Sequence, residues 1–218
     1  MTNTFKKSKK FDELIIMYKQ MAENGYTRSN GEFIPPEKVY GDLEPFRHKT
    51  YLKKVFEKFN IKTVLDYGSG KGNWNNEIDG QENLKDFLKL DEIFQYEPSL
   101  NKTEKKSSDC SICFDVLEHV FISDIPYVIH DIFSFSKKLV IINVACYKAS
   151  ALLPNGENAH ITVRPPLWWK GCIDTVSSNF PDINYSLIAS TSYTKATIFE
   201  DISHKEQIKN SGFIALDK

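Results

Sequence analysis

The chain has 218 residues, 41% of them hydrophobic, and its 28 basic side chains nearly balance 29 acidic ones, for a formal net charge of -1. This length suits one domain with a buried core. The charge balance argues against nucleic acid as a partner, because nucleic-acid-binding domains usually carry a strong basic excess. No segment approaches the roughly 20 apolar residues that span a bilayer, and the polar, Lys-rich N-terminus is not typical of a signal peptide. We therefore expect a cytoplasmic protein with no membrane partner.

The apolar residues change their spacing along the chain, and this predicts the order of the elements. Helical spacing indicates a helix at about 11–22, a Gly- and Pro-rich loop up to residue 45, and a second helix at about 45–59. Strands and helices then alternate. The expected strands are 63–66, 92–96, 110–114, 139–144 and a terminal pair at 185–190 and 195–200, with a helix at 124–135. Such alternation predicts a doubly wound α/β fold with a mainly parallel sheet and helices on both faces.

Two cysteines, Cys110 and Cys113, have the spacing of a C-x-x-C metal motif, but they fall within a predicted strand. Residues three apart on a strand point to opposite faces, so one ion could not easily bind both thiols. We predict that both are core residues.

A glycine-rich turn is the strongest signal in the sequence. The run VLDYGSGKG (64–72) takes a predicted strand directly into Gly68, Gly70 and Gly72, with Asp66 two residues before the first glycine. Glycine allows a sharp turn and close approach of a ligand, and the carboxyl end of a parallel strand is where ligands bind in such sheets. A dinucleotide site needs the spacing G-x-G-x-x-G, which is absent from this turn. The acid in front of the turn could instead meet a cationic ligand.

This run resembles the first signature, hh(D/E)hGxGxG, of the class I S-adenosylmethionine-dependent methyltransferases that act on small molecules. The resemblance implies that the loop wraps the methionine part of S-adenosylmethionine and that Asp66 holds its ammonium group. The segment FQYEP (94–98) resembles the second signature, which implies that Glu97 accepts hydrogen bonds from both ribose hydroxyls. The residues at 109–120, DCSICFDVLEHV, are similar to the run containing LEH in many small-molecule methyltransferases.

The resemblance also implies a division of the chain and a modified sheet. We expect residues 1–45 to form an N-terminal helical extension and loop, and 46–218 to form a methyltransferase domain with a seven-stranded type of sheet and a terminal antiparallel strand. Only about ten residues separate Pro98 from Asp109, so the third strand of the family is expected to be short or absent, and Asp109 is the candidate for the adenine contact. The expected cofactor-binding residues are Asp66, Tyr67, Gly68, Ser69, Gly70, Gly72, Glu97, Pro98, Asp109 and Asp115.

Carboxylates and imidazoles suggest a second centre. Asp115, Glu118 and His119 have i, i+3, i+4 spacing, which places them on one face if a helical turn starts there. With His160 from the next loop they form a set suited to a divalent cation. The set is similar to the E-x-x-E-H…H site of the small-RNA 3′-terminal 2′-O-methyltransferases, with Asp in place of the first Glu. These four residues are therefore the candidate ligands of a divalent metal.

An interpretation without a metal is also possible. LEH could simply start a helix, with His119 ordering the pocket wall and His160 anchoring a loop. These two histidines are the catalytic candidates in either case, because some acceptors, hydroxyls especially, need a base or a metal to remove a proton.

The loop 153–169 is the predicted acceptor-recognition segment. It follows a strand and carries hydrogen-bonding residues, among them His160 and Arg164, before the aromatic pair Trp168 and Trp169. The competing interpretation makes it a packing element with its tryptophans in the core.

These observations predict an S-adenosylmethionine-dependent methyltransferase that acts on a small-molecule acceptor, at oxygen. Two alternatives remain: a metal-dependent methyltransferase of nucleic-acid ends, and a non-catalytic cofactor-binding partner subunit. The sequence specifies neither the acceptor nor an oligomeric state.

Overall fold

A computed structural model describes residues 5–41, 43–78, 80–201 and 213–215 of the chain. Its α-helices are α1 (Lys9–Asn24), α2 (Lys49–Phe59), α3 (Leu84–Phe87), α4 (Ile125–Ser134) and α5 (Pro166–Ser177). Its strands are β1 (Tyr26–Thr27), β2 (Phe33–Ile34), β3 (Thr63–Tyr67), β4 (Glu92–Tyr96), β5 (Ser108–Phe114), β6 (Ser136–Ala145), β7 (Asn184–Ser192), β8 (Lys195–Asp201) and β9 (Phe213–Ala215).

The main sheet has seven strands in the order β4-β3-β5-β6-β7-β8-β9. The first five are mutually parallel, and β8 and β9 continue the sheet in antiparallel fashion. Between β4 and β5 the chain forms only a 3-10 helix, Pro98–Leu100, so β4 is the edge strand. The predicted α/β fold, with its missing third strand and its terminal antiparallel pair, is confirmed.

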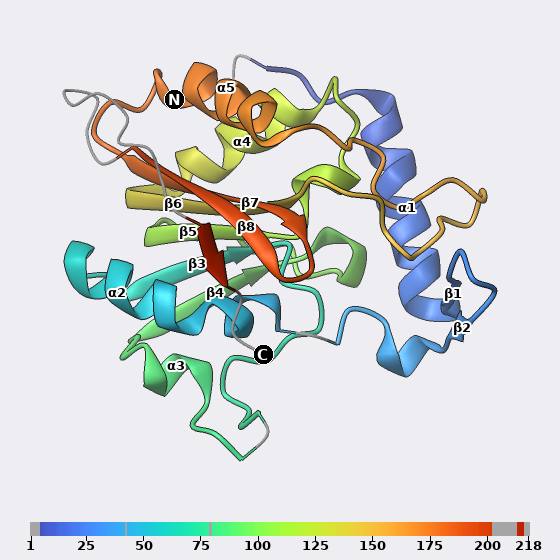
Figure 1. Cartoon of the computed structure of the whole chain (residues 1–218), viewed down its shortest axis with the longest axis horizontal. Coiled ribbons are helices and arrows are strands. Elements are labelled where there is room, and N and C mark those ends of the chain that lie inside the picture. The colour runs from blue at the N-terminus through green and yellow to red at the C-terminus, as the bar shows by residue number, and fades with distance from the viewer. Residues whose placement is uncertain (1–4, 42, 79, 202–212, 216–218) are drawn as a thin grey trace.

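Helices cover both faces of this sheet: α4 and α5 lie on one side, α2 and α3 on the other (Figure 1). Successive residues of the buried strands therefore enter two different cores. In β6, for example, Val140 belongs to the core under α4 and α5, whereas Ile141 belongs to the core under α2. Cys113 and Cys110 divide in the same way, fully buried on opposite faces, as predicted from their spacing.

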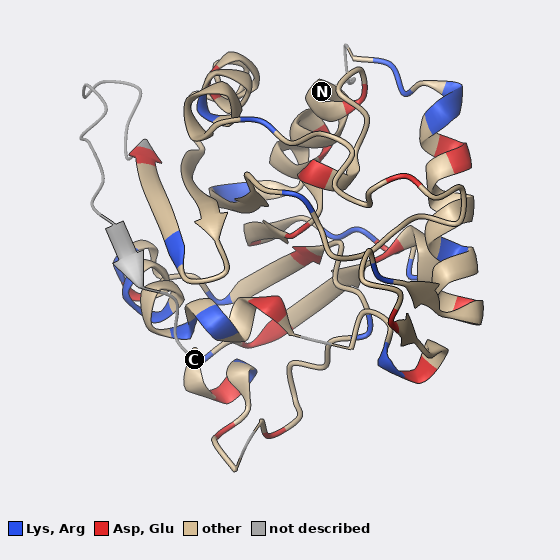
Figure 2. Ribbon diagram, turned by 45° about the vertical axis from the view of Figure 1, so that its right-hand side comes forward, with Lys and Arg blue, Asp and Glu red and all other residues tan. Residues whose placement is uncertain are grey.

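Charged side chains are interspersed around the fold and form no single-sign face in the view of Figure 2. No helix of the described ranges is long and apolar enough to cross a membrane.

Several predicted boundaries differ from the structure by a few residues, and two of these differences have a clear cause. The second helix was expected from residue 45, but Glu44–His48 form a 3-10 turn and α2 begins at Lys49. Strand β6 begins at Ser136, three residues before the predicted start, because the polar residues Ser136–Lys138 carry no hydrophobic signal although Ser136 pairs with Ser108 of β5.

The N-terminal extension packs across the carboxyl edge of the sheet. Helix α1 buries Leu14 and Met21 against Leu153 and Ala159 of the loop after β6. The segment after α1 also hydrogen-bonds to that loop, since Leu152 N donates to Thr27 O at 3.0 Å. The extension and this loop thus form a small third core of their own (Figure 1).

One buried carboxylate holds the start of α1. Asp124, which is fully buried just before α4, accepts hydrogen bonds from Ser8 N at 2.6 Å and from Ser8 Oγ at 2.8 Å. Hydrogen bonds to an ionised carboxylate are about twice as strong as neutral ones. The bonds to Ser8 therefore connect the N-terminus of α1 to the sheet domain.

We expect Asp124→Ala to lower the free energy of unfolding by about 2–4 kcal/mol, because it removes charge-assisted hydrogen bonds and leaves Ser8 unpartnered. Urea denaturation measures this loss. The matched control is Asp12→Ala, which removes an exposed ion pair with Lys7 and should cost less than about 0.5 kcal/mol. Equal stability of the two variants would contradict the role given to Asp124.

Candidate functional site

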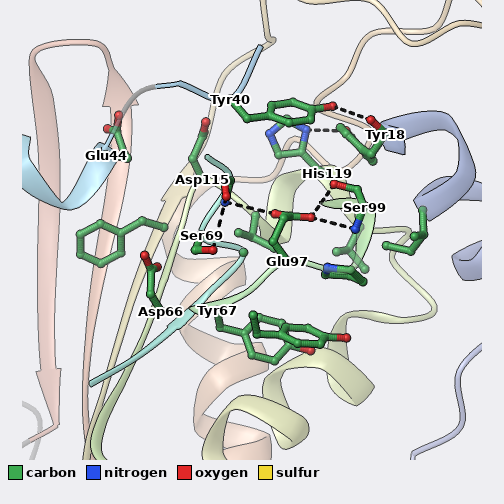
Figure 3. A pocket seen from close by; sticks show the side chains of 18 of the residues that line it. Tyr18, Tyr40, Glu44, Asp66, Tyr67, Ser69, Glu97, Ser99, Asp115 and His119 are labelled. Carbon is green, nitrogen blue, oxygen red and sulfur yellow. Dashed lines mark hydrogen bonds between the residues drawn. The ribbon is translucent and has the colours of Figure 1, made fainter. Parts of the chain in front are cut away.

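A cavity of about 550 Å³ lies at the carboxyl ends of β3, β4 and β5, within the size range of small-molecule sites. Its floor comes from the last residues of these strands and the residues that follow them, and its roof comes from α1 and the segments 26–41 and 43–45 (Figure 3). From the floor, the cavity is lined by Asp66, Tyr67, Gly68, Ser69, Gly70, Tyr96, Glu97, Pro98, Ser99, Asp115 and His119. From the roof, it is lined by Phe11, Leu14, Ile15, Tyr18, Tyr26, Ile34 and Tyr40, among others.

Two positions of the glycine turn require glycine. Gly68 has φ +84°, and a Cβ placed on it would lie 2.2 Å from Cγ2 of Val116. Gly70 has φ +52°, and its Cβ would lie 2.9 Å from the carbonyl oxygen of Tyr40. The chain of the roof therefore packs directly on the turn, an approach that a larger residue would prevent. Gly72 does not line the cavity; its carbonyl accepts a hydrogen bond from Gln95 at 2.8 Å.

The side chain of Asp66 is buried, yet it lines the cavity. Its carboxyl group accepts a hydrogen bond from Nε1 of Trp74 at 2.8 Å, and only 3% of the residue is exposed. Burial raises the pKa of Asp66 to about 6, although the hydrogen bond from Trp74 and the charge of Lys102 act in the opposite direction. A buried carboxylate of this kind would be stabilised by a cationic group in the cavity.

Glu97 connects the end of β4 to the glycine turn. One oxygen accepts hydrogen bonds from Ser99 N at 3.1 Å and Ser99 Oγ at 2.6 Å, and the other accepts one from Gly70 N at 3.3 Å (Figure 3). Lys102 completes the link by donating to the carbonyl of Gly70 at 2.8 Å. The two acids, Asp66 and Glu97, thus flank the turn.

Aromatic rings form a further wall of the cavity. The rings of Tyr67 and Tyr96 have centroids 4.7 Å apart, and the hydroxyl of Tyr67 donates to Asp131 at 2.8 Å. Lys105 pairs with the same carboxylate at 2.6 Å and lies over the ring of Tyr96 at 4.7 Å. Neither Tyr96 nor Lys105 was among the predicted residues: within FQYEP (94–98) only Glu97 and Pro98 were singled out, and Lys105 falls in a segment before β5 that has no recognisable motif.

Three of the four predicted metal ligands converge. Each of Asp115, His119 and His160 offers one ligand atom, and these atoms all lie within 4.8 Å of one another. Nε2 of His160 is 3.8 Å from a carboxylate oxygen of Asp115, and the two imidazole centroids are 4.7 Å apart. Burial lowers the pKa of His119 to about 4, with the neighbouring His160 acting in the same direction. His119 is therefore a neutral imidazole at physiological pH.

Glu118, the fourth predicted ligand, does not join this group. It is fully buried, and its carboxyl group accepts a hydrogen bond from Ala145 N at the end of β6. Burial, followed by the charge of Asp115, raises its pKa well above the usual range. The expected common face fails because Asp115 has φ +57° and Leu117–His119 form a 3-10 turn, so the i, i+3, i+4 geometry of an α-helix does not apply.

Asp109, the predicted adenine contact, lies far from the cavity. It is the second residue of β5, at the amino edge of the sheet, and it accepts hydrogen bonds from Lys62 N at 2.9 Å and Thr63 N at 3.2 Å. It also pairs with Lys138 at 3.0 Å. Because the ligand edge of a parallel sheet is its carboxyl edge, this expectation is corrected: Asp109 joins the starts of neighbouring strands.

The loop 153–169 does not line the cavity either. Trp169 is fully buried in the core under α4 and α5, and Arg164 lies over the ring of Trp168 at 5.8 Å. The side chain of Asn158 closes the loop on itself through Ala149 N and O, at 3.0 and 2.8 Å. The packing interpretation therefore fits this loop, except that it delivers His160 to Asp115 and His119. The roof over the cavity is the N-terminal extension instead.

Comparison with protein-family models and with curated proteins finds no match for this sequence. The functional argument accordingly depends on the site itself.

We expect Gly68→Ala to lower the free energy of unfolding by about 3 kcal/mol or more, since it adds a left-handed alanine and a clash with Val116. Gly156→Ala is the matched control: its φ is also +84°, but nothing lies within 4 Å of the added Cβ, so only about 1–2 kcal/mol should be lost. Thermal or urea denaturation compares them, and a Gly68 variant no less stable than the Gly156 variant would rule out close packing at the turn.

Proposed function

We propose that the protein binds S-adenosylmethionine in this cavity and transfers its methyl group to a small-molecule acceptor, at oxygen. The observation that carries the proposal is the pair of carboxylates at the ends of neighbouring strands, Asp66 and Glu97, on either side of a turn that excludes any side chain at Gly68 and Gly70. The buried acid suits the ammonium group of the methionine part. The acid at the end of β4 suits a pair of ribose hydroxyls, to which a carboxylate can accept two hydrogen bonds.

The reaction requires little covalent work from the protein. The acceptor oxygen attacks the methyl carbon, the carbon–sulfur bond breaks with its electron pair going to sulfur, and the acceptor proton leaves to a base or to solvent. The products are the methyl ether, neutral S-adenosylhomocysteine and a proton. Holding the two reactants in line supplies most of the rate enhancement in such a displacement. A cavity with floor and roof from different parts of the chain suits that task.

The two alternatives have less support. A methyltransferase of nucleic-acid ends would need a basic surface for phosphates, whereas charge is balanced overall and mixed around the fold (Figure 2). A non-catalytic cofactor-binding subunit would have no need of two imidazoles beside the cavity. Turnover of S-adenosylmethionine to S-adenosylhomocysteine with any acceptor would exclude this second alternative.

Calorimetry tests the cofactor. We expect binding of S-adenosylhomocysteine and no response to NAD. Glu97→Ala should weaken that binding by at least tenfold, because each charge-assisted hydrogen bond is worth roughly 1.5–3 kcal/mol. Glu92→Ala, which changes an exposed acid at the other end of the same strand, should leave the affinity unchanged. Tight binding of NAD with no response to S-adenosylhomocysteine would refute the proposal.

The raised pKa of Asp66, about 6, predicts how binding depends on pH. An ammonium group prefers the ionised carboxylate, so the affinity for S-adenosylhomocysteine should be constant above about pH 7 and fall by up to tenfold per unit below about pH 6. The stability of the ligand-free protein should depend on pH in the opposite direction. Because the pKa of Asp66 is higher in the folded than in the unfolded state, its contribution to the free energy of unfolding is lost as pH rises from about 4 to 6.

Calorimetric titrations between pH 5 and 7.5 measure this dependence. Asp66→Asn should bind more weakly at pH 7.5 and show a flat profile. A profile that falls equally steeply in both proteins would show that a group other than Asp66 controls binding.

A further inference from the structure

We infer that Asp115, His119 and His160 bind a divalent transition-metal ion through one carboxylate oxygen and the Nε2 atoms of both imidazoles. Asp115 and His119 line the cavity, and His160 lies directly behind them. The site stands on its own geometry; only the role of the ion toward an acceptor, considered below, rests on the proposed methyl transfer.

Hydrogen bonds to main-chain carbonyls fix which nitrogen of each ring has a free lone pair. Nδ1 of His160 lies against Tyr147 O at 2.5 Å, and Nδ1 of His119 lies 2.9 Å from Ala159 O. A carbonyl oxygen can only accept, so both Nδ1 atoms carry the proton and both Nε2 atoms are left as ligand atoms. Histidines that bind metals in proteins are commonly oriented by such a bond from the other nitrogen.

Helix α1 contributes to this arrangement. The hydroxyl of Tyr18 donates to Ala159 O at 3.2 Å and lies 2.6 Å from Nδ1 of His119 (Figure 3). The single Nδ1 proton of His119 is therefore shared between the Tyr18 hydroxyl and the Ala159 carbonyl. The edge-to-face packing of the two rings, with centroids 5.5 Å apart, fixes the plane of the imidazole. The N-terminal extension thus orients one of the three ligands.

The spacing between two of the three ligand atoms is close to what coordination requires, and all three lie within 4.8 Å of one another. Bonds of about 2.1 Å in a tetrahedral site place the ligand atoms roughly 3.4 Å apart. The measured 3.8 Å between Nε2 of His160 and the Asp115 carboxylate is only slightly longer. His160 is buried and held at Nδ1, whereas half of the Asp115 side chain is exposed, so small rotations of Asp115 can bring its carboxylate closer to the two imidazoles.

The donor set selects the kind of ion and leaves it incompletely coordinated. Two imidazoles and one carboxylate suit zinc, cobalt or manganese better than magnesium or calcium, which prefer oxygen ligands. Three protein ligands leave at least one position open, as in catalytic rather than structural sites. An ion there would lower the pKa of an acceptor hydroxyl that binds to it. The acceptor class that the site fits is therefore an alcohol or phenol whose oxygen reaches the ion.

The test is Co²⁺ binding by the untagged, metal-free full-length protein, followed by calorimetry and by the visible absorption of the bound ion. We expect one ion per chain, and at least tenfold weaker binding after Asp115→Asn, His119→Ala or His160→Ala. Asp109→Asn and His130→Gln are the matched controls, since Asp109 lies at the opposite edge of the sheet and His130 packs against Phe5 and Phe180. Both should bind Co²⁺ like the unchanged protein.

The Glu118→Gln variant tests whether the ion has three protein ligands or four. It keeps an oxygen that can accept from Ala145 N, so the fold is retained and Co²⁺ affinity should stay within about threefold. No Co²⁺ binding at millimolar concentration, or equal binding by all the ligand variants, would overturn the site. A loss of affinity in Glu118→Gln as large as in His160→Ala would overturn the three-ligand assignment. Because Co²⁺ binding is measured without S-adenosylmethionine, its failure is distinguishable from failure of the proposed methyl transfer.

Discussion

Parallel pairing of five strands is the constraint on which the rest of this structure depends. Parallel strands bring the residues that follow them to a common edge, and here that edge gathers Asp66, Glu97 and Asp115 from β3, β4 and β5. Helices on both faces bury the strands, so the carboxyl group of Asp66, which lies within β3, is held away from water. The raised pKa of Asp66 and the exclusion of side chains at the glycine turn both follow from that placement.

Hydrophobic spacing was enough to predict most of the fold. The strands and helices of the sheet domain lie close to their expected positions, because buried strands carry continuous apolar runs and the helices carry one apolar face. Strand β6 was predicted too short because its first residues are polar, and the 3-10 turn before α2 has no periodic signal. The positions of Asp66 and Glu97 at the cavity follow from their place at strand ends, which sequence alone specifies well.

The sequence was a poorer guide where geometry depends on a single backbone angle or on distant contacts. The left-handed conformation of Asp115 separates Glu118 from the two histidines, although their spacing predicted a common face. Asp109 was placed at the adenine because the gap before β5 was read as a shortened family motif, yet the residue begins its strand rather than ending it. The extension gave no motif at all. Its part in the cavity depends on tertiary contacts, such as Tyr40 on Gly70, that no local pattern encodes.

The hydrogen bonds between Ser8 and Asp124 also have a consequence for the order in which the chain folds as it is synthesised. The two residues are 116 positions apart, so α1 leaves the ribosome long before its anchor exists. Bringing such distant segments together costs loop-closure entropy. This cost is smaller once β3, β4 and β5 have packed, because their pairing already brings Asp124 close to its final position. We therefore expect the floor of the cavity to form before the roof closes over it. A nascent chain that stalls before residue 124 would carry an open glycine turn with α1 undocked.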